Sequence, residues 1–222
     1  MPSPPPDFQT IYVDDSLLVL AKPSGLLSVP GRGEDKQDCL SSRVQQHYPD
    51  ALVVHRLDMA TSGLLLMARS PYMQRALGKL FETRAIQKRY IAVVDGHLPS
   101  SPDWQLIDLP IAVDWPNRPL RIIDESCGQP SQTRWRALSF DQRTHSTRVE
   151  LEPLTGRSHQ LRVHLQALGH PILGDTLYAP QAVQAKAPRL FLHACALAFN
   201  RPSNELSRPP EALLSFASEP DF

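Results

Sequence analysis

At 222 residues the chain is long enough to bury a sizeable core, either as one large domain or as two closely packed lobes. Its 23 basic and 23 acidic residues give zero net charge, which is not the overall basicity usual for nucleic-acid-binding proteins. The three cysteines form no C-x-x-C pair, which argues against a disulfide framework or a zinc site and fits a reducing compartment. No signal peptide and no run of ~18 apolar residues is found, so we expect a cytoplasmic protein without membrane association.

The charge distribution is more informative than the total. Residues 51–90 hold seven lysines and arginines against only Asp58 and Glu82. A local basic face is therefore expected despite the neutral sum, and it keeps a phosphate-bearing partner open.

Hydrophobic periodicity and turn residues predict the elements in chain order. The proline-rich residues 1–9 are expected to be disordered. Helices are expected over residues 37–48, after the Ser70-Pro71 start signal, and between a Ser158 cap and Gly169. Residues 98–130 are expected to form loops with a short strand or two at the rim of a cleft. Strands are expected at residues 11–13, 17–21, 64–68, 88–94, 132–140, 146–152, 190–199 and 212–217.

Strands outnumber helices in this pattern, and hairpins outnumber β-α-β units. This favours an α+β fold with a central, mostly antiparallel mixed β-sheet and flanking helices. No internal repeat and no flexible linker is visible. We therefore expect one catalytic domain over residues 10–222.

The most informative stretch is His55–Gly63, with the sequence His-Arg-Leu-Asp-Met-Ala-Thr-Ser-Gly. It leads into the apolar run 64–68, so Asp58 is expected on a short loop entering a buried strand, where a scaffold can aim a side chain at a ligand. A lone aspartate in such a loop more often caps backbone N–H groups. The residues alone leave both interpretations open.

The loop closely resembles the signature of the RluA family of RNA pseudouridine synthases. Three further segments resemble motifs of the same family in the same order, and the likeness spans residues 11–222. They are Lys22–Leu26, Lys88–Tyr90, and Thr155–His164 together with Gly169–Asp175. The resemblance implies the pseudouridine synthase fold, with an active-site cleft between two halves, and isomerisation of uridine in RNA without a cofactor or metal.

The resemblance also assigns site residues. Asp58 corresponds to the catalytic nucleophile, Arg157 to the arginine that pairs with it, and Tyr90 to the active-site tyrosine. A guanidinium would keep the carboxylate charged and oriented in a poorly hydrated pocket. Leu161 corresponds to an apolar residue near the uracil, although a leucine on a helix face is more often core.

The target uridine must leave the stacked helix to be reached. Arg56 has the length and planar shape to fill the gap by stacking, and His55 could assist. The alternatives are a salt-bridged arginine and a histidine bonded to backbone. His159 and His164 lack metal-ligand partners, so a zinc site is not expected.

Lys22–Arg32 and Asp114–Pro119 resemble the members that modify both 23S rRNA and a tRNA anticodon stem-loop, and a monomer that acts on these RNAs is expected. No S4 RNA-binding domain is visible before the first strand. The alternatives are a synthase for tRNA or rRNA only, an N-glycosidase that releases uracil, and a non-catalytic RNA-binding or chaperone module. The glycosidase is disfavoured because retaining enzymes place a second carboxylic acid about 5 Å away.

Overall fold

The computed structural model describes residues 8–202 and 213–222 of the chain. The described residues form two compact units: unit 1 takes residues 8–87, 194–202 and 213–221, and unit 2 takes residues 88–193 with Phe222. In the described part of the chain, no helix is long and apolar enough to cross a membrane.

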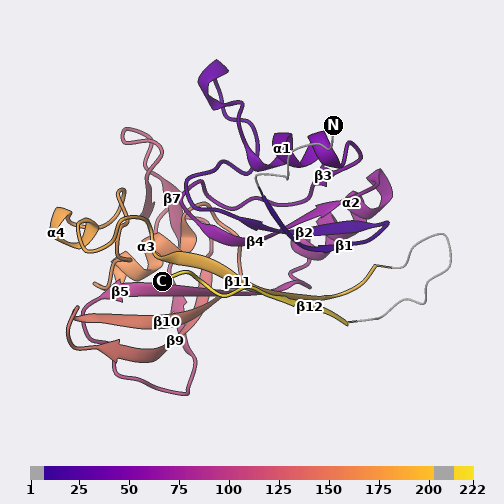
Figure 1. Cartoon of the computed structure of the whole chain (residues 1–222). Helices are drawn as coiled ribbons and strands as arrows, with labels where there is room; N and C mark the ends of the chain where they lie inside the picture. Colours follow the sequence, from indigo (N-terminus) through magenta and orange to yellow (C-terminus); the bar gives the residue numbers. More distant parts are fainter. Residues whose placement is uncertain (1–7, 203–212) are drawn as a thin grey trace. The chain divides into compact units, whose positions relative to one another are not determined.

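Unit 1 is built on a sheet in which β1, β2, β4 and most of β11 are successive neighbours, with β3 on β4 and β12 on β11 (Figure 1). Strand β2 pairs antiparallel with β4, so that Lys22 lies opposite Gly63 at one end of the pair. The signature loop therefore enters the sheet directly beside Lys22. The elements of this unit are β1 (Gln9–Val13), β2 (Leu17–Lys22), a 3-10 turn (Glu34–Lys36), α1 (Leu40–His47), β3 (Leu52–Val53), β4 (Ser62–Ala68), α2 (Pro71–Glu82), β11 (Leu192–Asn200) and β12 (Leu213–Ala217).

Strand alternation divides the core of unit 1 between the two faces of its sheet. Leu64 and Leu66 of β4 pack with Met73 and Leu77 of α2 on one face. Leu65 and Met67 pack on the other face, in a cluster with Leu40 and Val44 of α1. Because β4 is buried on both faces, it reads as a continuous apolar run and is held rigidly where the loop enters it.

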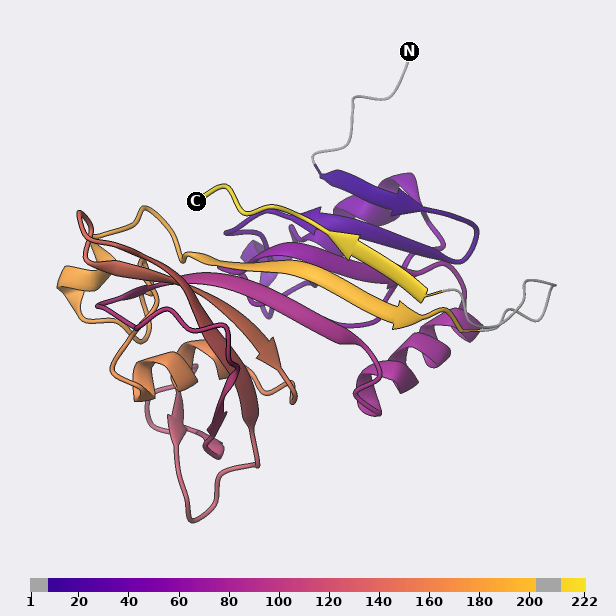
Figure 2. The ribbon, with the colours of Figure 1, turned by 90° about the horizontal axis from the view of Figure 1, so that it is seen from below.

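Unit 2 contains strands paired in the order β5-β10-β9-β6, and a separate two-stranded sheet of β7 and β8. Helix α3 packs against β8, β9 and β10, as Figure 2 shows for β9 and β10. The elements of this unit are β5 (Gln87–Asp95), β6 (Gln105–Asp108), β7 (Ile111–Val113), β8 (Arg121–Ile123), β9 (Gln132–Asp141), β10 (Ser146–Pro153), α3 (Gln160–Ala167) and α4 (Gln181–Gln184).

The predicted elements are largely confirmed. Both units pair their strands mainly antiparallel and carry only a few helices, which confirms the α+β class. Helix α2 begins as predicted, with the Ser70 hydroxyl accepting from the Met73 amide at 3.1 Å and Pro71 in the first turn. Three short strands, β6, β7 and β8, occupy the region expected to hold one or two.

Two expectations are corrected. Ser158 does not cap α3: the cap is His159, which has left-handed backbone angles (φ 58°) and makes no side-chain cap bond. The Gln160 side chain instead ties the preceding turn to the helix, since its oxygen accepts from the Arg157 amide at 3.0 Å. Phe8 is buried and Gln9 begins β1, so the segment expected to be disordered ends before them; its residues 1–7 lie outside the described chain.

Candidate active site

Asp58 lies in the irregular loop between β3 and β4 and is half-buried. A backbone turn closes the loop, because the Thr61 amide donates to the Asp58 carbonyl at 3.1 Å. The loop then meets the rigid, fully buried strand β4. This is the arrangement predicted for Asp58: a carboxylate on a short loop supported by a sheet.

The residue before Asp58 is held by a serine from the segment Lys22–Ser28. The Ser28 hydroxyl donates to the Leu57 carbonyl at 2.7 Å and accepts from the Leu57 amide at 3.1 Å. Ser28 and Leu57 are both buried, so these bonds are shielded from water. The reciprocal pair fixes the backbone on the N-terminal side of Asp58.

The residues after Asp58 are held by the same segment. The Met59 carbonyl accepts from the Lys22 ammonium at 2.9 Å and from the Gly25 amide at 2.9 Å. The Ser24 hydroxyl donates to the Ala60 carbonyl at 2.7 Å. Segment Lys22–Ser28 therefore clamps the loop on both sides of Asp58, and we call it the clamp segment.

Lys22 is a buried cation at the centre of this clamp, with only 1% of its surface exposed. Its ammonium has three acceptors: the carbonyls of Met59, of Pro23 at 2.8 Å and of Leu26 at 2.7 Å. Burial lowers the pKa of Lys22 to about 8, and the charge of Asp58 opposes that shift. At neutral pH Lys22 is thus a positive charge within electrostatic reach of Asp58.

His55 and Arg56, which lie three and two residues before Asp58, differ in their surroundings. The His55 Nε2 atom accepts from the Leu66 amide at 2.9 Å, and its ring stacks on Phe81 with centroids 4.4 Å apart. These are the contacts of the backbone-bonded alternative. Arg56 is exposed, and within the described residues its side chain has no hydrogen bond or ion pair, which does not fit the salt-bridged alternative.

The end of the loop requires glycine. Gly63 has φ 112°, and a Cβ atom there would lie 2.3 Å from the Ala194 carbonyl oxygen. A side chain would collide with the backbone of β11, and β4 could not keep its place. The glycine of the signature is needed for close packing of two strands.

Unit 2 carries the other predicted site residues. Arg157 is exposed in the turn before α3, where its Nε lies 3.4 Å from the Pro130 carbonyl oxygen. Tyr90 is half-buried on β5, paired in register with Leu151 of β10. Leu161 is buried on α3 with 7% of its surface exposed. Asp58, His55 and Arg56 belong to unit 1.

A buried ion pair holds α3, the helix that follows Arg157. The Arg162 guanidinium donates to the Asp175 carboxylate at 2.8 and 2.6 Å, and both side chains are almost fully buried. The same carboxylate accepts from the amides of Leu177 and Tyr178. The pair joins α3 to the segment after it, which is the last motif singled out in the sequence.

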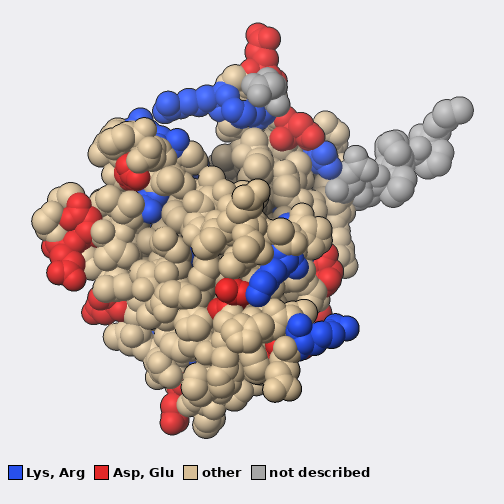
Figure 3. All heavy atoms as spheres, turned by 90° about the vertical axis from the view of Figure 1, so that its left-hand side faces the viewer, with Lys and Arg blue, Asp and Glu red and all other residues tan. Residues whose placement is uncertain are grey.

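The basic side chains of α2 lie at the surface of the protein. On α2, the exposed Lys79 pairs with Glu82 at 3.1 Å, and Arg75 is exposed too, as is Arg84 just after the helix. Figure 3 shows basic and acidic side chains scattered over one face of the molecule without a continuous patch of either sign. Among the described residues, no group of three or more His, Cys, Asp or Glu side chains could hold a metal ion.

The roles of Ser24 and Ser28, and the contacts of Lys22, were not predicted from the sequence. The clamp segment was visible as a motif, but its role depends on carbonyl groups about thirty residues further along the chain. Backbone acceptors leave no side-chain pattern in a sequence, so the contacts could not be predicted from it.

The family follows from this fold, this loop and one direct match. The model of the RNA pseudouridylate synthase family matches residues 16–167. The chain belongs to this family of RNA-modifying isomerases.

Individual relatives are similar over most of the chain. The dual-specificity RNA pseudouridine synthase RluA of Escherichia coli K12 is 49% identical over 193 residues, covering 87% of both chains. The protein of the same name from Yersinia pestis is 50% identical over 192 residues, covering 86% of this chain and 92% of its own. Among solved structures, human RNA Pseudouridylate Synthase Domain Containing 1 superposes with a TM-score of 0.79 at 26% identity, covering 100% of this chain and 87% of that one. These likenesses agree with the predicted pseudouridine synthase fold.

Proposed function

We propose that this isomerase converts uridine to pseudouridine in both 23S rRNA and a tRNA anticodon stem-loop. The dual specificity is supported by the names and the high identity of the bacterial relatives. The observation that carries the assignment of the site is the clamp on both sides of Asp58. A carboxylate carried on a fixed backbone, within electrostatic reach of a buried cation, suits covalent or electrostatic catalysis at a sugar carbon.

In the proposed reaction Asp58 acts as the nucleophile on a uridine that has left the RNA stack. The N1–C1′ bond breaks, the uracil turns while held, and C5 forms a new bond to C1′. C5 gives its proton to water and N1 gains one, so the atoms balance without a cofactor or an external group.

The remaining residues receive proposed roles. Arg157 keeps the Asp58 carboxylate charged and oriented. Tyr90 packs on the base and assists the final proton transfer, and Leu161 supplies apolar contact to the uracil. Arg56 stacks in the gap that the flipped nucleotide leaves. The contacts of His55 favour a supporting role for it over a direct RNA contact.

We further propose that residues 10–222 act as one catalytic domain, in a monomer. We also propose that the enzyme acts in the cytoplasm, where its RNA substrates are made. The free cysteines Cys39, Cys127 and Cys195 are consistent with a reducing compartment.

The function is tested with an anticodon stem-loop and a 23S rRNA hairpin, each tritiated at uridine C5. The expected result is release of tritium to water from both RNAs, with pseudouridine and no free uracil in the digested product. Release from one RNA would reduce the proposal to a single substrate, and free uracil would support an N-glycosidase. Tight binding without any release would favour the RNA-binding module.

A further inference from the structure

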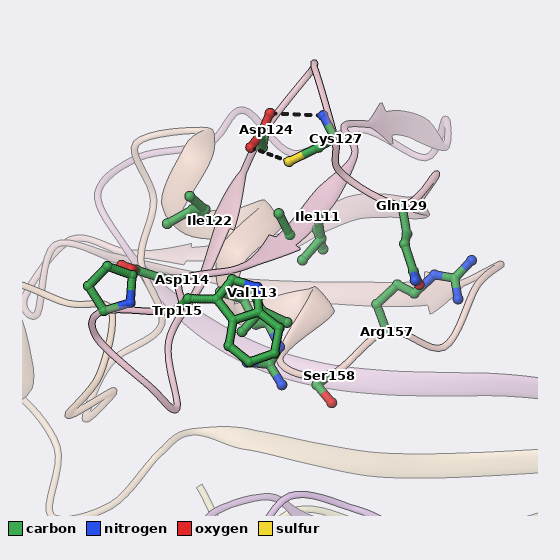
Figure 4. Close-up of a pocket in the computed structure, with 13 residues that line it drawn as sticks. Ile111, Val113, Asp114, Trp115, Ile122, Asp124, Cys127, Gln129, Arg157 and Ser158 are labelled. Atoms are coloured by element: carbon green, nitrogen blue, oxygen red, sulfur yellow. Dashed lines mark hydrogen bonds between the residues drawn. The ribbon is translucent and has the colours of Figure 1, made fainter.

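Unit 2 contains a hollow of about 540 Å³ beside the β7–β8 pair, within the size range of small-molecule sites. Figure 4 shows the Trp115 ring on one side, Arg157 and Gln129 on another, and Asp124 across from the ring. Aliphatic side chains of the two strands, Ile111 and Ile122 among them, lie between these walls. The Asp114–Pro119 segment, which the proposed catalysis does not use, supplies part of this wall.

Trp115 is the unusual member of the wall, because 67% of its large apolar surface is exposed. The Arg118 guanidinium lies 3.6 Å from the ring centroid and holds the ring by a cation–π contact. Trp115 lines the hollow, whereas Arg118 is not among the described residues that line it. The indole is therefore held in place by the arginine while it still faces the hollow.

The charges of the wall indicate which part of a nucleotide would enter. Two carboxylates, Asp114 and Asp124, offset the cations Arg121 and Arg157. Hydrogen bonds from Cys127 and Ser126 hold the pKa of Asp124 well below its ordinary value, so this group is ionised at neutral pH. A phosphate would meet these carboxylates, whereas an uncharged, flat base meets the indole and the aliphatic floor.

The remaining wall offers hydrogen bonds in the plane of such a base. The backbone of Gln129 is fixed by paired bonds with Ile111 at 2.9 and 3.0 Å, which leaves its side-chain amide to face the hollow beside Arg157 (Figure 4). An amide and a guanidinium together present donors and an acceptor, the set that reads the edges of unpaired bases.

We propose that the hollow binds one unpaired nucleobase of the substrate RNA, stacked on Trp115 with its edge at Gln129 and Arg157. The inference rests on the proposed function and extends it. Since Arg157 is also assigned to the reaction centre, the bound base belongs to a nucleotide near the target uridine, not to the uridine itself. The hollow then selects RNA loops by a base outside the reaction.

The test uses a panel of anticodon stem-loops, each with one loop nucleotide made abasic, and measures Kd and KM for wild type, Trp115→Ala and Trp115→Phe. Trp115→Ala is expected to weaken binding of the intact stem-loop about tenfold or more, and Trp115→Phe to restore most of it. The matched control is Leu106→Ala, an exposed apolar side chain of the same unit away from the hollow.

One abasic position should reproduce the loss in wild type and cause no further loss in Trp115→Ala. Equal Kd values for wild type and Trp115→Ala, with the wild type active, would overturn the inference and leave the proposed function intact. Additive losses at every abasic position would also overturn it, because Trp115 would then touch no single base. A wild type inactive on every intact RNA would instead refute the proposed function.

Discussion

The Lys22 ammonium donates a hydrogen bond to the carbonyl oxygen of Met59, 2.9 Å away and one residue beyond Asp58. The same cation lies within electrostatic reach of the Asp58 carboxylate. One buried side chain therefore both fixes the backbone next to the proposed nucleophile and places a positive charge within reach of it. Lys22 is a positioning residue in this account, since it acts through Asp58 and not on the RNA.

The first prediction concerns pH. The pKa of Lys22, about 8, lies below its ordinary value of 10.5, so the folded protein releases this proton before the unfolded chain does. As pH rises above about 8 the ammonium is lost, and with it the charge near Asp58. Turnover should fall above pH 8 in the wild type. Lys22→Met should be slow at neutral pH and should lack this alkaline limb.

The titration of Lys22 also makes the stability of the protein depend on pH, in a direction that follows from the lowered pKa. Between about pH 8 and 10.5 the unfolded chain binds more protons at Lys22, so this group makes folding more favourable as pH rises. Urea titrations at several pH values, compared with Lys22→Met and with the exposed-lysine control Lys36→Met, measure the difference. A steeper gain in stability with pH in Lys22→Met than in wild type would contradict the account.

A second prediction concerns Ser28. Ser28→Ala leaves the amide and carbonyl of buried Leu57 without partners, which should destabilise the protein by about 1–3 kcal/mol. It should also lower turnover, because the backbone before Asp58 is released. Ser100→Ala, at an exposed loop position outside the clamp segment and the hollow, is the control for removal of a serine hydroxyl. Unchanged turnover in folded Ser28→Ala would show that the clamp is not needed for catalysis.

A third prediction separates two glycines. Gly63→Ala should destabilise unit 1 severely, since its Cβ would lie 2.3 Å from a backbone oxygen. Gly78→Ala lies in α2 with open space around it, and should stabilise the protein by up to about 1 kcal/mol. Thermal unfolding of both variants measures the contrast, and similar melting temperatures would refute it.

A fourth prediction concerns the buried ion pair between Arg162 and Asp175. Asp175→Asn leaves the Arg162 charge buried without its counter-charge, and should cost about 3–5 kcal/mol. Glu82→Gln removes an exposed pair with Lys79 and should change stability by less than about 1 kcal/mol. Equal changes in the free energy of unfolding for the two variants, measured in urea, would show that burial does not determine how much the Arg162–Asp175 pair contributes to stability.

The helices and strands were predicted well from the sequence because their signals lie within the segments themselves. The start of α2 at Ser70-Pro71 and the buried strand β4 follow from capping and from a continuous apolar run. The start of α3 was predicted one residue early, because the chain turns into the helix through the left-handed backbone of His159, with no side-chain cap bond. A left-handed backbone at a residue other than glycine is set by its surroundings and leaves no capping pattern in the sequence.

Less of the candidate site than of the fold could be predicted from the sequence. Asp58 and its loop could be found by resemblance, and the structure shows how the loop is held. The stacking of His55 on Phe81 and the burial of Lys22 depend on residues distant in sequence. The hollow at Trp115 depends on the packing of short strands that the sequence predicted only as loops with a strand or two.

The most direct test compares wild type with Asp58→Asn on one C5-tritiated anticodon stem-loop under single-turnover conditions. The account predicts that Asp58→Asn binds the RNA with a similar Kd but releases tritium more than about 10³-fold more slowly, since the nucleophile is gone. Asp103→Asn, an exposed carboxylate in a loop of unit 2, should match the wild type. Tritium release by folded Asp58→Asn at the wild-type rate would contradict the assignment of Asp58 as the catalytic residue.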